Sequence, residues 1–292
     1  MKKLLLALLF FTLMINLKAQ EIPYYLEELT ATEFIDAVDK SSKTCILPIG
    51  VFEKHGSHLP LGTDLYIARE IASRAAAQEY TVVYPWYYFS QINEARHQPG
   101  TIAYSPELIW KVLQETLDEL SRNGFEKIII VNGHGGNNAF LDYFGMSQLS
   151  ERRDYTLYWF RPTGNPEVSR KVEELTQPDP YDSHGGNTET SAIAAIRPDL
   201  AHTEKASEQS GVNQQRLSHL SRVYTGIWWY ANYPNHYGGD GSKSNAEAGE
   251  LILNARVEQL VQLIRDVKND EIAPALQKQF FDEAEQPLNT KQ

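Results

Sequence analysis

The sequence is nearly without cysteine. Cys45 is the only one among 292 residues, so no disulfide can form within the chain. It lies in an apolar run, Cys45–Ile49, which favours a small buried residue over a nucleophile. The chain also lacks internal repeats, low-complexity runs and linker-like stretches, so nothing indicates a second domain. Apolar residues make up 42% of the chain, which is enough for one sizeable core.

Basic residues are fewer than acidic residues in this chain. The chain has 27 lysines and arginines against 38 acidic residues, a formal net charge of −11. Such an acidic protein is poorly suited to bind nucleic acid or an anionic membrane surface. We therefore expect a small-molecule substrate and no nucleic-acid partner.

Long hydrophobic runs are missing except at the start of the chain. Lys2 and Lys3 precede an apolar run over residues 4–15, and Ala19 follows, which is the order of a secretory signal peptide. The run is shorter than the roughly 20 residues that a membrane span needs. We expect residues 1–19 to be removed and residues 20–292 to form one domain, secreted or periplasmic and without a membrane anchor. Removal of three lysines would move the net charge to about −14.

Apolar runs and helical patterns alternate along the rest of the chain. Strands are predicted at residues 44–49, 81–84, 127–132 and 155–160. Helices are predicted from Thr30 and at residues 64–78, 105–123, 138–152, 187–196 and 245–267, with a long loop at 85–104 and a polar tail at the end. This order is typical of an α/β protein, here a single three-layer α/β/α domain with a mostly parallel sheet.

Four polar side chains follow the first long predicted strand within twelve residues. They are Glu53, His55, His58 and Asp64. The carboxyl edge of a parallel sheet is where α/β proteins usually place their chemistry. Carboxylates and imidazoles together are the usual ligands of zinc- or manganese-like divalent ions. The pattern predicts a metal site.

The tetrapeptide His-Gly-Gly-Asn occurs twice, at 134–137 and at 184–187. Each copy precedes a predicted helix, and the second is followed by Glu189 in the first helical turn. Glycine beside histidine lets the backbone approach a ligand closely. Three loops would thus supply His134, His184 and carboxylates to one sheet edge, which strengthens the metal interpretation.

These motifs resemble those of the creatininase (creatinine amidohydrolase) family. The similar stretches are Glu-Lys-His-Gly-Ser-His-Leu-Pro-Leu-Gly-Thr-Asp at 53–64, Asn-Gly-His-Gly-Gly-Asn at 132–137 and His-Gly-Gly-Asn-Thr-Glu-Thr-Ser at 184–191. A late stretch at 238–249 resembles the turn into the family's last long helix. The resemblance covers residues 44 to 255 and does not identify the substrate.

The resemblance implies a site with two divalent ions, which could be zinc, manganese or iron. The positions that match the family's ligands are Glu53, His55, Asp64 and His134, with Asp64 matching the carboxylate that bridges both ions. Members that hydrolyse creatinine carry a further glutamate where this chain has Gly136. The resemblance offers Glu189 as its replacement, and the departure at Gly136 argues against creatinine as the substrate.

The remaining histidines have less definite roles. His184 matches a histidine that the family uses for proton transfer. We expect His58 to orient a ligand or a loop rather than bind metal. His97 fits a pocket residue and an ordinary loop residue equally well. His236 and Asp240, near the late motif, are candidates for contacts with a ligand or with the substrate.

The sequence therefore predicts an exported, metal-dependent amidohydrolase. It would hydrolyse a C–N bond of a small amide, a cyclic amide or a formamide through a metal-bridging hydroxide. One alternative is a metal-dependent ring-opening hydrolase or isomerase of a carbohydrate-like substrate. Another is a metal- or ligand-binding protein without turnover. The family resemblance also implies a homo-oligomer, with a hexamer as the expected form.

Overall fold

Four parallel strands form the centre of the molecule. The computed structural model describes residues 22–290, and its sheet has the order β2-β1-β3-β4. The strands are β1 (Thr44–Ile49), β2 (Val82–Val83), β3 (Lys127–Asn132) and β4 (Thr156–Phe160). Ile49 of β1 pairs with Asn132 of β3, so the two central strands end side by side. The loops that follow them therefore start from the same edge of the sheet.

Side chains alternate between the two faces of the sheet and divide the interior into two cores. Ile46 of β1 and Ile129 of β3 belong to one core, whereas Leu47 and Ile128 belong to the other. Because helices cover both faces, β1 and β3 read as nearly continuous apolar runs rather than as an apolar–polar alternation.

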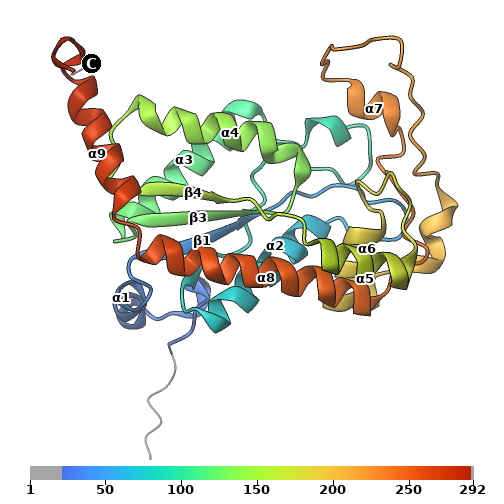
Figure 1. Cartoon of the computed structure of the whole chain (residues 1–292), viewed down its shortest axis with the longest axis horizontal. Helices are drawn as coiled ribbons and strands as arrows, with labels where there is room; N and C mark the ends of the chain where they lie inside the picture. The colour runs from blue at the N-terminus through green and yellow to red at the C-terminus, as the bar shows by residue number, and fades with distance from the viewer. Residues whose placement is uncertain (1–21, 291–292) are drawn as a thin grey trace, which may run out of the picture.

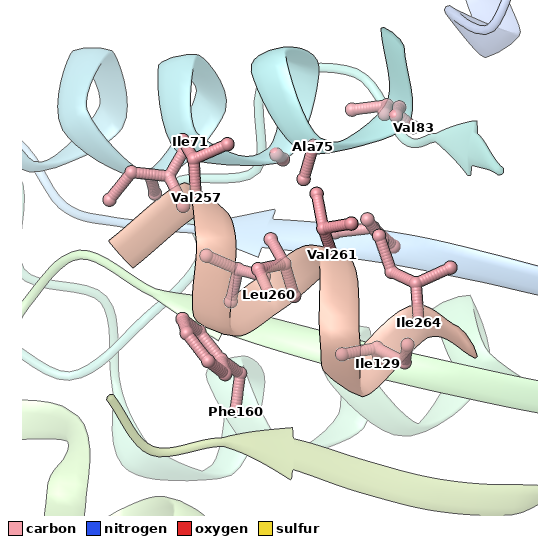
Figure 2. Packing of buried hydrophobic residues seen from close by; sticks show 14 of the residues in the cluster. Ile71, Ala75, Val83, Ile129, Phe160, Val257, Leu260, Val261 and Ile264 are labelled. Carbon is pink, nitrogen blue, oxygen red and sulfur yellow. The ribbon is translucent and has the colours of Figure 1, made fainter. Parts of the chain in front are cut away.

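Three helices cover the first face (Figure 1). They are α2 (Thr63–Gln78), α6 (Asn187–Ile196) and α8 (Ala246–Lys268). Figure 2 shows Val257, Leu260, Val261 and Ile264 of α8 lying among side chains of α2 and of the strands. Helix α8 packs against both α6 and α2, so these three helices form one layer.

The second face is covered by α1 (Ala31–Lys40), α3 (Pro106–Arg122) and α4 (Asn138–Ser147). Helix α1 starts with a capping box between Thr30 and Glu33, and the Ser105 hydroxyl accepts a hydrogen bond from Leu108 N at the start of α3. Leu113, Leu117 and Phe125 fill the space between α3 and the sheet.

The N-terminus of α2 lies against the end of β3. A Cβ atom at Gly133 would collide with the carbonyl of Asp64, so glycine at this position allows the close approach. The approach places the first turn of α2, with Asp64, directly beside the loop that carries His134.

The predicted three-layer α/β/α architecture with a parallel sheet is confirmed. Helix α2 begins at Thr63, so Asp64 lies inside its first turn. The sequence patterns missed α5 (Pro166–Thr176) and the short α7 (Trp228–Asn232), and the expected polar tail contains α9 (Ile272–Ala284). In Figure 1 α9 extends away from the sheet, and much of its apolar surface is exposed.

The signal-peptide prediction lies on residues 1–19, outside the described residues, and stays a prediction. Within residues 22–290, none of the helices combines the length and apolar character that crossing a membrane requires.

The core packing of α8 can be tested by truncating Leu260, whose side chain is 0% exposed. We expect Leu260→Ala to lower the free energy of unfolding by about 2–5 kcal/mol, because it removes buried contacts and leaves a cavity. Urea denaturation at fixed metal content measures the change. Leu276→Ala in α9, at a side chain 59% exposed, is the control and should change it by less than about 0.5 kcal/mol. Equal effects of the two changes would contradict this packing.

Candidate metal centre

Two loops and two helix N-termini bring the predicted ligands together at the carboxyl edge of the sheet. The loop after β1 carries Glu53 and His55, the loop after β3 carries His134, and α2 and α6 contribute Asp64 and Glu189 from their first turns. Their ligand atoms form groups that lie within 4.8 Å of one another. The groups are Glu53–Asp64–His134, His55–Asp64–Glu189 and Glu53–His55–His184.

Asp64 presents a different oxygen to each of two groups. Its Oδ1 lies 3.1 Å from His55 Nε2, which is also 3.7 Å from Glu189 Oε2. Its Oδ2 lies 3.3 Å from His134 Nδ1, which is 2.7 Å from Glu53 Oε1. One carboxylate thus joins two adjacent groups of ligand atoms. This is the arrangement that a bridging ligand between two cations requires.

Neighbouring groups fix the imidazole tautomers. His55 Nδ1 lies 3.3 Å from the carbonyl of Glu53 and donates to it, so Nε2 is the ring nitrogen that faces the carboxylates and that a cation would meet. The indole of Trp229 donates to His236 Nδ1 at 2.8 Å. His236 therefore carries its proton on Nε2 and donates it to Glu53 Oε2. His236 thus holds one oxygen of Glu53 and leaves the other for the ligand group.

The cluster is built to hold positive charge. Glu53 Oε1 and Asp64 Oδ2 are buried and accept no hydrogen bond from the described residues. Burial lowers the pKa of His55, but Asp64 and Glu189 outweigh burial and raise it to about 10. For the Glu189 carboxyl, burial acts in the opposite direction and raises the pKa to about 7. Divalent cations would satisfy these oxygens and replace the protons, so the donor set fits the metals that the sequence predicted.

His184 lies beside the ligand groups. Its Nε2 is 2.9 Å from the carbonyl of Lys54 and donates to it, and its Nδ1 is 3.9 Å from Glu189 Oε2. Burial lowers the pKa of His184 well below its usual value, and the nearby imidazoles of His55 and His236 add to this lowering. The side chain is therefore a neutral imidazole with its Nδ1 lone pair available.

The other histidines and Asp240 have more peripheral places. His58 Nε2 lies 2.9 Å from Thr190 Oγ1 and 3.0 Å from Gly185 O, so it supports the loop that carries His184. Burial lowers its pKa to about 4. His97 is exposed and contacts the carbonyl of Pro234 at 3.0 Å. Asp240 is exposed and accepts from Ser242 N. Among His58, His97, His236 and Asp240, His236 is the residue that contacts a predicted ligand, Glu53.

Sequence reasoning missed Glu94, in the long loop between β2 and α3. Its Oε1 lies 3.6 Å from His134 Nε2, a buried atom without a hydrogen bond among the described residues. The amide of Gln91 donates to Glu94 Oε2 at 2.9 Å and holds the carboxylate in place. A Cβ atom at Gly136 would collide with both Glu94 and His134. The contact between Glu94 and His134 therefore requires glycine at position 136. No pattern in the sequence relates two positions so far apart.

A cavity of about 620 Å³ opens beside the ligand groups. His134, His184 and Glu189 line it together with residues of β4 and α8. This volume suits a small molecule. A larger cavity of about 730 Å³ lies between α1 and α3 among Leu26, Phe34 and Val112, far from the ligand cluster. We assign chemistry to the cavity beside the ligands, because that is where the titratable groups converge.

The Glu94 contact can be tested through metal affinity. An acceptor at Nε2 orients a ligating histidine and makes it a better donor. We expect Glu94→Gln to weaken metal binding at the Glu53–Asp64–His134 group by about 10- to 100-fold. Competition with a fluorescent zinc chelator measures this affinity. Glu107→Gln, at an exposed site on α3, is the control, and an unchanged affinity in Glu94→Gln would disprove the role.

Comparison with known proteins identifies the family of the chain. The family model described as creatinine amidohydrolase matches residues 27–264. The creatinine amidohydrolase of Pseudomonas putida is 24% identical over 267 residues, which span 83% of this chain and 96% of the relative. The 3-dehydro-scyllo-inosose hydrolase of Thermotoga maritima is 24% identical over 254 residues, which span 78% of each protein.

Other relatives match a smaller part of the chain. A mycofactocin precursor peptide peptidase of Mycolicibacterium smegmatis is 31% identical over 55% of this chain and 60% of its own length. A 2-amino-5-formylamino-6-ribosylaminopyrimidin-4(3H)-one 5'-monophosphate deformylase of Methanococcus maripaludis is 30% identical over 36% of this chain and 47% of its own length.

Solved structures show the same fold. A crystal structure of creatinine amidohydrolase superposes with a TM-score of 0.70 at 21% identity, covering 85% of this chain and 98% of that one. Structures described as a Zn–Zn type and as a Mn creatininase superpose equally well, which fits a divalent-metal site in this fold. The predicted resemblance is confirmed, because the family match extends over most of the sequence. The chain belongs to the creatininase family of amidohydrolases.

Proposed function

We propose that the protein is an exported, two-metal amidohydrolase that cleaves a C–N bond of a small amide, a cyclic amide or a formamide. The observation that carries the proposal is Asp64, whose two oxygens face two adjacent ligand groups beside a cavity of about 620 Å³. The relatives named for creatinine and for a formylamino compound support this choice of bond.

The ligand groups divide the work between two positions. Glu53, Asp64 and His134 would hold one ion, and His55, Asp64 and Glu189 the other. Divalent ions at such positions supply an activated water and polarise a carbonyl oxygen. The site lies within the fold and is largely shielded from solvent, which strengthens these charge interactions.

His184 would move the proton. Its Nε2 hydrogen is committed to the Lys54 carbonyl, so Nδ1 is the atom that accepts a proton from the attacking water. The same atom can then deliver that proton to the leaving nitrogen. The lowered pKa of His184 keeps the imidazole neutral before the reaction, as a proton acceptor must be.

A second candidate is hydrolytic opening of a carbohydrate-like ring, which the inosose hydrolase among the relatives favours. The two candidates differ in their products. Hydrolysis of an amide releases an amine or ammonia, and hydrolysis of a formamide releases formate and an amine. A cyclic amide opens to an amino acid derivative. A carbocyclic ketone opens to a carboxylate without any nitrogen product. NMR of reaction mixtures with cyclic amides, N-formyl compounds and inososes distinguishes them.

Self-association and export complete the proposal. Between α6 and α8 the chain exposes large apolar side chains, and such patches mark contact surfaces in soluble proteins. They include Val212, Val223, Tyr224 and Ile227. These side chains support a homo-oligomer, which analytical ultracentrifugation would measure. Export rests on the order of residues 1–19, and the mass of the mature N-terminus tests it.

Metal content tests the two-ion site. We expect about two ions per chain in protein purified without chelator, because the two ligand groups share Asp64. Asp64→Ala should lose both ions and reduce turnover by at least about a thousandfold, since it removes a ligand from each position. Glu189→Gln should lose mainly one ion. Mass spectrometry of the digested samples gives the counts.

Asp39→Ala is the matched control, because Asp39 is an exposed aspartate of α1 outside the ligand groups. It should keep both ions and full turnover. Two retained ions and normal turnover in Asp64→Ala would show that the bridging assignment is wrong. One ion per chain in the unmodified protein would show that Gly136 removes a ligand that Glu189 does not replace.

A further inference from the structure

Arg256 of α8 is an unpaired cation in the wall of the metal-site cavity. It lines the cavity of about 620 Å³ together with His134, His184 and Glu189. Among residues 22–290, no hydrogen bond or ion pair joins its guanidinium to another group, and Glu189 is the one carboxylate that acts on it at longer range. Its neighbours Leu253 and Val257 are buried in the core, so the helix holds the side chain at this wall.

The other charged side chains of the wall are satisfied within the protein. Arg161 pairs with Asp142 and stacks over Trp159, 3.8 Å from the ring centroid. Asp182 accepts hydrogen bonds from Thr188 N at 3.0 Å and from Thr188 Oγ1 at 2.6 Å. In the described part of the chain, Arg256 is thus the charged group of this wall that lacks a partner.

An unpaired guanidinium in this place is costly. The side chain is half-buried and keeps its charge at any physiological pH, so its guanidinium loses part of its hydration without an ion-pair partner to compensate. Glu189 offers little compensation, because it belongs to a ligand group and its charge is used there when cations are bound. The holoenzyme would then present positive charge at both the ligand groups and Arg256.

We infer that the substrate carries a compact oxyanion, a carboxylate or a phosphate, which Arg256 binds while the scissile C–N bond lies at the ligand groups. The planar fork of a guanidinium matches both oxyanions, because each offers two oxygens to parallel N–H donors. This inference rests on the proposed amidohydrolase function and narrows its substrates to small anionic amides or formamides.

Matched hydroxamic acids can test the inference, because a hydroxamate chelates divalent ions without being a substrate. The three probes are succinamohydroxamic acid, which is neutral at its far end, succinomonohydroxamic acid, which carries a carboxylate, and 3-phosphonopropionohydroxamic acid. Isothermal titration calorimetry with the metal-loaded protein measures each affinity. We expect an anionic probe to bind at least about tenfold more tightly than the neutral one, as charge-assisted hydrogen bonds require.

Arg256→Met should abolish this preference and leave the affinity for the neutral probe unchanged. The unchanged affinity shows that the variant is folded and holds metal. Arg256→Lys should keep part of the preference, because it keeps the charge and loses the fork. Arg161→Met is the matched control, an arginine in the same wall that is already paired, and it should keep the full preference.

The outcomes separate this inference from the proposed function. Equal affinities in the unmodified protein, or a preference that survives in Arg256→Met, would overturn the inference. Loss of the preference in Arg161→Met alone would also overturn it. A stronger phosphonate signal identifies phosphate as the oxyanion, and a stronger carboxylate signal identifies carboxylate. If the preference depends on Arg256 but no C–N bond is cleaved in any amide, Arg256 is an oxyanion-binding residue and the proposed reaction fails.

Discussion

The site depends on one electrostatic constraint, three carboxylates held close together in the interior. Glu53, Asp64 and Glu189 converge within reach of His55 and His134, and the fold provides no lysine or arginine ion pair to any of the three among the described residues. Such a cluster is tolerable only if cations or protons reside in it. The raised pKa values of His55 and Glu189 express this need in the metal-free protein.

The sheet meets this constraint by bringing separate loops to one edge. Because β1 and β3 are parallel neighbours that end in register, the loops after them begin next to each other. Gly133 lets α2 approach, so that Asp64 lies between His55 and His134. Helix α8 secures the opposite side, because it packs on α6 and fixes the helix that carries Glu189. The contacts that pack the core therefore also set the positions of the ligands.

Most of the architecture and the ligand set could be predicted from the sequence, since β1, β3 and α8 have strong apolar patterns and the ligands lie in short motifs. Helix α9 was missed although Ile272, Leu276 and Phe280 recur at helical spacing, because the polar residues among them indicated a tail. Glu94 and Arg256 could not be predicted. Each is a single charged residue outside the sequence motifs. Its role depends on residues from distant segments that lie beside it in the folded chain.

Position 136 is where the proposed site departs from the pattern that the family resemblance implies. A carboxylate from the loop after β3 is absent here, and two other segments supply carboxylates nearby, Glu189 from α6 and Glu94 from the loop before α3. All these segments reach the same edge of the sheet. A carboxylate from any of them can therefore lie beside the ligand groups, whatever its place in the sequence. The glycine in turn makes room for Glu94 against His134. With Glu189 as the replacement that we propose, the site would keep its negative charge while the surface around it changes.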